Sequence, residues 1–555
     1  MSFSAGHRPV KRNLEKPSLL DYDYIIIGSG FGGSVSALRL SEKGYKVLML
    51  EKGKWLKAND FPKTNWHLKK WLWLPALKFF GLFKITVFRH VAILSGVGVG
   101  GGSLVYANTL PVPNAKFFKA ESWAHLADWE NELKDFYSMA LQMMGAAMNP
   151  RLETGDRALQ QLAQEIGKAD HCNATQVAVY FGEPGVAHPD PYFEGKGPSR
   201  TGCIFCGGCM LGCRYNSKNT LDKNYLYFAQ QNGVKIQAES EVYDVTPLTE
   251  PNGSAGYQVK WQSSTSFFKT KGEFTCRGIV FAGGVLGTVK LLLKLKQSSL
   301  PRLSDKVGTG IRTNSESLIG VTVFDKKTVF SDGIAIGSIL HTDEHSHLEP
   351  VRYSAGSGFW RLLMSPLVDG SNALVRAAKV AWDLLWHPLD NLRAFWVDDW
   401  SKRTQILLFM RTIDSTLRFS RGFFGMKSSL DQGPAPTAFI PEAKDLAERY
   451  ARIVQGKPTA LATETLLGIP TTAHILGGAV MGKDSSEGVI DKDNRVFGYE
   501  NMYVCDGSMI SANPGVNPSL SIMALSERAM SKISPKLEQV EFLQSKLEFS
   551  DQAED

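Results

Sequence analysis

Four cysteines lie within eleven positions of the chain, at Cys203, Cys206, Cys209 and Cys213. Their spacing, C-x₂-C-x₂-C-x₃-C, is that of bacterial ferredoxin ligands, although Arg214 stands where a proline usually follows. Thiolates are soft ligands, and the glycines between them let the chain wrap closely around a bound group. The run therefore predicts an iron–sulfur cluster, [4Fe–4S] or [3Fe–4S], with a structural zinc ion, disulfides or free thiols as alternatives.

A glycine-rich turn near the start of the chain has the spacing of a dinucleotide-binding unit. The apolar run Tyr24–Ile27 leads into a turn that contains Gly28, Gly30 and Gly33, and a helical segment and a second apolar run then end in Glu51. In such a unit the glycines allow a tight turn, close approach of a pyrophosphate and helix–sheet packing, and the acid binds ribose hydroxyls. The alternative is a tight turn in an α/β core without a ligand.

A second glycine-rich segment covers residues 95–104 and includes Gly100, Gly101, Gly102 and Ser103. Backbone of this kind adopts positive φ angles and offers N–H donors to a flat ligand without side chains in the way. Valines rather than serines separate the other glycines, which argues against the alternative, a flexible linker.

The composition is that of a globular protein, with 43% hydrophobic and 21% charged residues among 555. A net charge of +7 is compatible with peripheral association with an anionic membrane, but no arginine-rich patch indicates nucleic acid. No apolar run reaches the length of a membrane span, and the first twenty residues contain no export signal. These features predict a cytoplasmic protein.

Two stretches of the chain combine aromatic side chains with lysine or arginine side chains. Residues 65–90 mix tryptophans and phenylalanines with lysines, which fits either a membrane-surface segment or an aromatic cover packed on the nucleotide-binding domain. Residues 373–396 again mix tryptophans and cations, and they lie within a predicted substrate or lid domain.

The C-terminal motifs complete a family pattern. Residues 471–478 read TTAHILGG, and residues 488–529 contain VCDGSMISANPGVNPSLS. Together with the two glycine segments, they resemble the glucose–methanol–choline family of flavin oxidoreductases, and within it the bacterial cholesterol oxidases. The resemblance covers most of residues 21–535 and is weak across 120–200 and 320–470. It implies an α/β fold, with a Rossmann-like FAD-binding domain assembled from discontinuous segments and a substrate domain built on an antiparallel sheet with covering helices.

The chain divides accordingly into a series of segments. The predicted ranges are a first FAD-binding segment (19–115), a helical and loop insertion (116–200), the cysteine segment (201–221), a second FAD-binding segment (222–317), the substrate domain (318–470), a third FAD-binding segment (471–535) and an acidic tail (536–555).

The resemblance also implies how FAD is bound. No histidine occupies the glycine loop where some family members attach FAD covalently, so noncovalent binding is expected. The implied FAD-binding residues are Gly28, Gly30, Gly33, Glu51, Gly100, Gly101, Gly102, Ser103, Val242, Ala282, Gly283, Asp506, Gly507, Asn517 and Pro518.

Three side chains are the implied catalytic groups. Oxidation of an alcohol needs a group that takes the hydroxyl proton, and an imidazole titrates in the range where it can do so. By resemblance His474 has this role, and Asn517 hydrogen-bonds the substrate oxygen. Alternatives are a structural histidine and a turn residue before proline. Family members also use a glutamate from the substrate domain, for which Glu349 is the candidate. Neighbouring histidines leave a metal site there as a minor alternative.

The predicted function is FAD-dependent oxidation of a hydroxyl group on a bulky apolar alcohol, such as a sterol or terpenoid. The cysteine run departs from the family pattern, and it favours transfer of electrons through the cluster to an unidentified one-electron acceptor. Two alternatives stay open. One is redox-neutral or light-driven chemistry on a lipid, as in a related photodecarboxylase, and the other is a non-catalytic electron-transfer module. Stereochemistry, acceptor and oligomeric state do not follow from one sequence.

Overall fold

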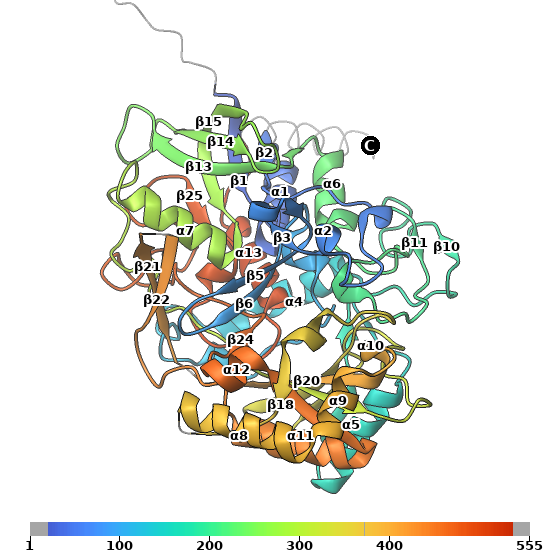
Figure 1. Ribbon diagram of the computed structural model, residues 1–555. Coiled ribbons are helices and arrows are strands. Elements are labelled where there is room, and N and C mark those ends of the chain that lie inside the picture. Colours follow the sequence, from blue (N-terminus) through green and yellow to red (C-terminus); the bar gives the residue numbers. More distant parts are fainter. Residues whose placement is uncertain (1–19, 371, 414, 424, 537–555) are drawn as a thin grey trace, which may run out of the picture.

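The structure of the protein is a computed structural model that describes residues 20–370, 372–413, 415–423 and 425–536. Two seven-stranded sheets form its framework, and the cysteine segment lies beside them (Figure 1). Nearly all of the predicted acidic tail lies outside the described residues.

The first sheet is built on the predicted dinucleotide-binding unit. Strand β1 (Tyr22–Ile27) leads through the glycine turn into helix α1 (Phe31–Glu42), and β2 (Val47–Leu50) pairs parallel with β1. Residues Tyr24–Ile27 of β1 and all of β2 are apolar and buried, as expected for parallel strands covered on both faces. The remaining strands come from distant parts of the chain: β12 (Lys235–Gln237), β13 (Ser240–Pro247), β14 (Tyr257–Ser263), β15 (Lys271–Phe281) and β25 (Met502–Val504).

The strand order is β12-β2-β1-β15-β14-β13, with β25 pairing parallel with β15. Helix α13 (Ser519–Ser531) packs against α1 and is buried along almost its whole length. A helix with buried residues on every side belongs in a protein interior. Further helices around this sheet are α4 (Trp129–Met143), α6 (Tyr225–Gln231) and α7 (Gly284–Lys296). The predicted Rossmann-like domain of discontinuous segments is therefore confirmed.

The second sheet is antiparallel throughout, which also confirms the prediction for the substrate domain. Helices α5 (Thr154–Glu165) and α11 (Pro441–Val454) pack against it through an apolar cluster. Its strands, in spatial order, are β19 (Met364–Pro366), β23 (Gly456–Leu461), β16 (Ser317–Val323), β20 (Thr404–Arg411), β18 (Ser346–Val351), β17 (Ser338–His341) and β8 (Cys172–Ala174).

A small sheet brings the third FAD-binding segment to the glycine loop. Strand β6 (Ala92–Gly96) pairs antiparallel with β5 (Phe83–Val87) and parallel with β24 (Thr471–Thr472). Because β6 leads into the glycine loop and β24 leads to His474, this sheet places the two motifs side by side.

The aromatic segment 65–90 contains α2 (Leu68–Trp71), β3 (Trp73–Leu74) and β4 (Phe79–Phe80). Trp71, Trp73 and Phe83 are buried, and Trp71 and Phe83 stack in an apolar cluster with the turn that carries the cysteines. The segment is therefore a packed aromatic cover, although its cluster includes Trp360 and Trp400 of the substrate domain besides Leu104 of the glycine loop.

Four further helices belong to the substrate domain: α8 (Ala373–Trp386), α9 (Pro388–Phe395), α10 (Trp400–Arg403) and α12 (Ala462–Leu467). Among the helices of the described residues, none is both long and apolar enough to span a membrane. The shorter elements are α3 (Ala115–Phe118), β7 (Ala147–Met148), β9 (Gln176–Val177), β10 (Ala187–His188), β11 (Arg200–Thr201), β21 (Leu417–Gly422) and β22 (Gly425–Leu430).

Candidate functional site

One cavity of about 1020 Å³ is lined by residues of both large sheets. At one end it meets the glycine turn after β1, and at the other end it is bounded by apolar side chains of the substrate domain. Twelve of the fifteen predicted FAD-binding residues line it: Gly28, Gly30, Glu51, Gly101, Gly102, Val242, Ala282, Gly283, Asp506, Gly507, Asn517 and Pro518.

The three other predicted residues lie behind this wall. A Cβ atom at Gly33 would come 2.2 Å from the carbonyl oxygen of Gly28, so Gly33 serves the close packing of α1 on the turn. Gly100 has a positive φ of 99°, and the Ser103 hydroxyl donates to its carbonyl oxygen at 2.7 Å. These residues shape the loop rather than the cavity surface.

The nucleotide end of the cavity fits a dinucleotide. Gly28 and Gly101 both have positive φ angles, and a Cβ atom at Gly101 would lie 2.6 Å from the Cα atom of Gly30. Helix α1 begins at this point without a side-chain cap and without an acidic residue in its first turn. Its first N–H groups are therefore available to a phosphate group.

Two carboxylates fix the loops around this end. Glu51 accepts hydrogen bonds from the Ser29 N–H at 3.0 Å and from the Gly53 N–H at 2.8 Å. Asp506 accepts from the Gly284 N–H at 2.8 Å, which ties the third FAD-binding segment to the start of α7. Burial raises the pKa of Asp506, although several hydrogen bonds to its carboxyl group oppose the rise.

His474 and Asn517 meet at the boundary between the nucleotide end and the apolar end. The Asn517 Nδ2 atom lies 3.3 Å from the His474 Nε2 atom, and both residues line the cavity. On the other side of the ring, the His474 Nδ1 atom lies 2.9 Å from the Glu316 Oε1 atom. With the hydrogen placed on Nδ1, the ring donates to the carboxylate, and the lone pair on Nε2 accepts from the Asn517 amide or from another donor in the cavity.

Glu316 is a site residue that the sequence analysis did not identify. Its carboxylate also accepts from the Thr472 hydroxyl at 2.5 Å and from the Ala473 N–H at 3.0 Å. Burial alone would raise the pKa of Glu316, but His474 and these hydrogen bonds lower it below its ordinary value. No local pattern marks Glu316, because its partners lie more than 150 residues away and meet it only through the fold.

Glu349, the predicted catalytic glutamate, lies on β18 behind Asn517 and does not line the cavity. Its side chain is fully buried, and burial raises its pKa to about 8, with the charge of Glu316 adding to the rise and the Asn517 amide opposing it. The His347 Nε2 atom lies 3.8 Å from the Glu349 Oε1 atom, and burial lowers the pKa of His347 to about 3. Both groups are therefore uncharged near neutral pH.

The four predicted cluster ligands line one small cavity beside the glycine loop. The Phe205 N–H donates to the Cys203 sulfur and the Ser217 N–H donates to the Cys213 sulfur, each at 3.4 Å. All seven cysteines are free of disulfide bonds. Within the described residues, no group of three or more His, Cys, Asp or Glu side chains is arranged to hold a metal ion, so a cluster is not shown.

One turn separates the cysteine cavity from the large cavity. In the 3-10 turn Cys209–Leu211, Cys209 lines the small cavity and Met210 lines the large one. Buried Lys218 joins this turn to the glycine loop, because its ammonium group donates to the carbonyl oxygens of Cys209 at 2.8 Å and Leu104 at 3.1 Å. Burial lowers the pKa of Lys218 to about 7, with the neighbouring thiols opposing the shift.

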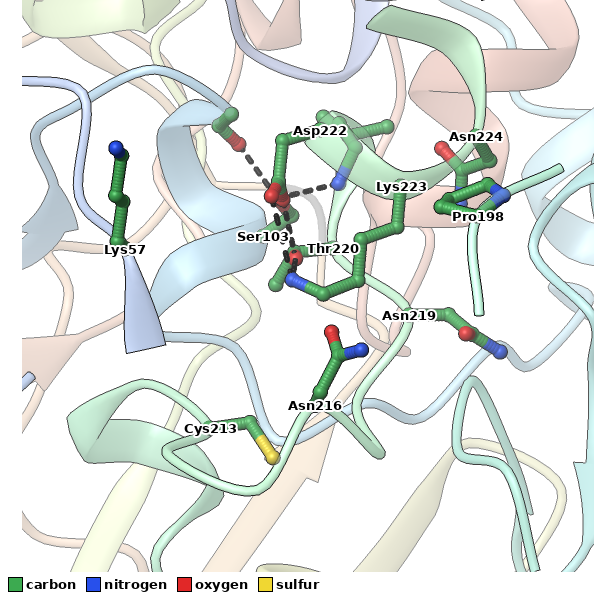
Figure 2. A network of polar contacts seen from close by, with 12 residues as sticks. Lys57, Ser103, Pro198, Cys213, Asn216, Asn219, Thr220, Asp222, Lys223 and Asn224 are labelled. Atoms are coloured by element: carbon green, nitrogen blue, oxygen red, sulfur yellow. Dashed lines mark hydrogen bonds and ion pairs between the residues drawn. The ribbon is translucent and has the colours of Figure 1, made fainter. Parts of the chain in front are cut away.

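The segment after the cysteines is held to the glycine loop by a second set of contacts. Figure 2 shows Thr220, Asp222 and Lys223 hydrogen-bonded to one another beside Ser103. The Leu221 N–H donates to the Ser103 hydroxyl oxygen at 3.2 Å. The cysteine segment is therefore fixed to the same loop that lines the nucleotide end of the cavity.

Comparisons with known proteins agree with this geometry. A family model described as GMC oxidoreductase matches residues 416–526, and a model described as an NAD(P)-binding Rossmann-like domain matches residues 26–56. The chain is 44% identical over 527 residues to a cholesterol oxidase of Acinetobacter baumannii, which covers 93% of this chain and 95% of that protein.

Two further relatives support the same grouping. A cholesterol oxidase of Mycobacterium tuberculosis (strain H37Rv) is 43% identical over 535 residues, covering 92% of this chain and 91% of that protein. The solved structure of pyridoxine 4-oxidase from Mesorbium loti is similar in fold, with a TM-score of 0.59 at 14% identity, and covers 92% of this chain and 99% of that one.

Proposed function

The chain belongs to the GMC oxidoreductase family of FAD-dependent enzymes that act on CH–OH groups. We propose that it oxidises a hydroxyl group on a bulky, sterol-like alcohol. The observation that carries the proposal is the position of His474 and Asn517, at the meeting point of the nucleotide end and the apolar end of one cavity. The names of the relatives, cholesterol oxidases, support the same substrate class.

The apolar end suits a lipid-like substrate. Large cavities lined mainly by apolar side chains, with a few convergent polar groups, are typical of sites for such ligands. The polar side chains around the proposed reaction point are His474, Asn517 and Glu316. The apolar side chains of this end include Phe83, Ile336, Val351, Trp360, Met364, Trp400, Ile406 and Leu408.

Each polar group has a proposed role. The Nε2 atom of His474 takes the hydroxyl proton, and the Asn517 amide donates to the substrate oxygen and orients it. Glu316 is a positioning residue that holds the ring through Nδ1. FAD, when bound, supplies the hydride acceptor. We propose that it is held noncovalently by the twelve predicted residues that line the cavity, with Gly33, Gly100 and Ser103 shaping the loops that carry them.

The test is the absorbance spectrum of the anaerobic holoenzyme in the dark, before and after addition of a detergent-dispersed 3β-hydroxysteroid. We expect the flavin band to bleach, and His474→Ala to slow the bleaching about 10²–10⁴-fold, the range for loss of a general base. His67→Ala, an exposed histidine, is the control. Dark bleaching that is equally fast in His474→Ala would contradict the role of His474. A spectrum that responds only to light would favour the redox-neutral alternative.

For the electron acceptor, we propose that Cys203, Cys206, Cys209 and Cys213 hold an iron–sulfur cluster that passes electrons singly to a partner. The support is the ligand spacing, the single cavity that all four line, and the N–H groups directed at two of the sulfur atoms. Further support comes from the turn Cys209–Leu211, because its residues line both the small cavity and the large one. The proposal requires the thiols to turn toward a common centre when a cluster is present.

Iron and acid-labile sulfide in anaerobically purified protein test this second proposal. We expect both in the wild-type protein and in Cys172→Ser, and neither in Cys206→Ser. If the protein contains zinc but no sulfide, the four cysteines hold a structural zinc ion and not an iron–sulfur cluster. The cluster would be refuted by protein that contains neither iron nor sulfide but whose flavin is still reduced by substrate. The reduced flavin would then pass its electrons directly to oxygen or to another acceptor.

A further inference from the structure

Three lysines line the nucleotide end of the large cavity without a partner. Lys52 follows Glu51 directly, Lys84 lies on β5 and Lys290 lies on α7, and all three line the cavity wall. Within the described ranges of the chain, none of their ammonium groups forms a hydrogen bond or an ion pair. Lys52 and Lys84 are also half-buried. A charge that leaves water normally acquires a partner, so these ammonium groups point to a negatively charged ligand.

Other lysines of the same end serve as a comparison. The Lys269 ammonium group donates to the carbonyl oxygen of Ser263 at 2.8 Å, and that of Lys294 donates to the carbonyl oxygen of Tyr243 at 2.5 Å. Both lysines line the cavity too, but their ammonium groups are fixed on the protein backbone. The three unpartnered lysines therefore differ from these neighbours in being available to a ligand.

The three unpartnered ammonium groups lie close enough to act on one another. The pKa of Lys84 is lowered to about 8, first by burial and then by the positive charges of Lys52 and Lys290, while the carboxylate of Glu241 opposes the shift. A cleft that holds several charges of one sign concentrates its field on ligands of the opposite sign. Three like charges in one cavity wall thus favour an anion that carries more than one charge.

Their positions bracket the middle of the dinucleotide site. Lys52 adjoins Glu51, the residue expected at the ribose. Lys84 pairs with Ser95 across β5 and β6, directly before the glycine loop that is expected at the flavin. Lys290 lies in the middle of α7, and long side chains on a helix lean toward its N-terminus, here toward the part of α7 that lines the cavity. In a dinucleotide, the pyrophosphate lies in this interval between the two ends.

We propose that Lys52, Lys84 and Lys290 bind the pyrophosphate group of FAD. Each phosphate of this group carries a negative charge, and a lysine ammonium is a compact point charge that binds phosphate oxygens. The N–H groups at the start of α1 contribute hydrogen bonds but only partial charges. The lysines supply the full charges that these N–H groups lack. This role of the lysines rests on the FAD site of the proposed function and not on the identity of the alcohol.

Equilibrium release of FAD from the diluted holoenzyme tests the proposal, with free FAD separated by ultrafiltration and measured by its fluorescence. We expect Lys52→Gln/Lys84→Gln to bind FAD at least about tenfold more weakly than wild type, because two charge-assisted contacts are lost. The difference should shrink at high sodium chloride concentration, because salt screens the lysine charges. The matched control is Lys269→Gln/Lys294→Gln, which removes two charges from the same end of the cavity and should keep the FAD affinity close to that of wild type.

Two results would overturn the proposal. One is a Lys52→Gln/Lys84→Gln variant that binds FAD as tightly as wild type, or no more weakly than the control variant does. The other is weaker binding whose ratio to wild type does not change with salt, which would assign the two lysines to the fold rather than to a phosphate charge. No alcohol is present in this measurement. A wild-type flavin that the steroid does not bleach would therefore refute the proposed substrate and leave the lysine result valid.

Discussion

The ring of His474 is held from two sides by groups of different character. The buried, ionised carboxylate of Glu316 accepts a hydrogen bond from Nδ1. The neutral amide of Asn517 lies next to Nε2. Glu349, a short distance behind Asn517, is kept neutral by burial. Two glutamates of one site are thus held in opposite protonation states, which is the arrangement expected where one carboxylate must orient a base without a second charge competing for it.

Replacing Glu316 by glutamine should test whether this side chain orients the His474 ring or only supports the fold. In Glu316→Gln the amide cannot hold the ring as a charged acceptor, so we expect kcat to fall by about 10²-fold or more, with KM little changed. Glu464→Gln is the matched control, because Glu464 is equally buried and bonds the Thr471 N–H rather than the ring. Steady-state kinetics with equal flavin content measure the effect. A Glu316→Gln variant that is active and keeps the wild-type pH profile of kcat would refute the positioning role.

Glu464 also predicts how stability depends on pH. Burial raises its pKa from 4.5 to about 8 in the folded protein. Between these values the folded chain binds more protons than the unfolded chain, so stability falls as pH rises from 4.5 toward 8. Glu464→Gln removes this contribution. We expect the midpoint of thermal unfolding of the variant, relative to wild type, to be higher at pH 8.5 than at pH 5. An equal difference at both pH values would contradict the raised pKa.

At the scale of elements, those parts of the fold and the site that depend on short, contiguous sequence patterns can be predicted from the sequence. The strand, glycine turn, helix and acid of residues 22–51 form a local unit, and both glycine segments border the cavity. Glu316 was not found because its role exists only where β16, β24 and the histidine loop meet. The aromatic segment 65–90 was ambiguous, since side-chain types do not tell whether tryptophans face a core or a membrane. The domain boundaries stay a prediction.

The glycine loop gives a prediction at this scale. Gly101→Ala places a methyl group 2.6 Å from the Cα atom of Gly30 and strains a φ of 52°. We expect purified Gly101→Ala to contain much less flavin than wild type. The control is Gly167→Ala, which has a positive φ of 68° but no atom within 4 Å of the added methyl group. Flavin absorbance per mole of protein is the measurement, and equal flavin in both variants would show that the loop does not approach the cofactor closely.

At the scale of the whole molecule, helix α13 near the end of the chain packs against helix α1 near its start. The Glu527 carboxylate on α13 accepts from the Arg39 guanidinium of α1 at 2.6 Å and from the Tyr225 hydroxyl of α6 at 2.8 Å. Three segments that are far apart in sequence therefore share one buried carboxylate. The FAD-binding domain requires nearly the full chain, as the discontinuous segments already implied.

Glu527→Ala should consequently destabilise the holoenzyme by about 3 kcal/mol, because it leaves a largely buried guanidinium and a buried hydroxyl without this acceptor. Glu42→Ala is the control. Its ion pair with Arg39 at 2.8 Å lies at the surface, and we expect a loss of roughly 0.5 kcal/mol or less. Urea unfolding followed by circular dichroism measures both. Similar losses in the two variants would show that the buried contact adds nothing beyond the surface pair.

The turn Cys209–Leu211 is a wall common to two cavities, because Met210 lines the large one while Cys209 and Leu211 line the small one. A displacement of Met210 by a ligand in the large cavity would be passed to Cys209, its neighbour in the chain. Any coupling of this kind acts by the same factor in both directions. The occupancy of the large cavity would then be readable as a change in the environment of Cys209.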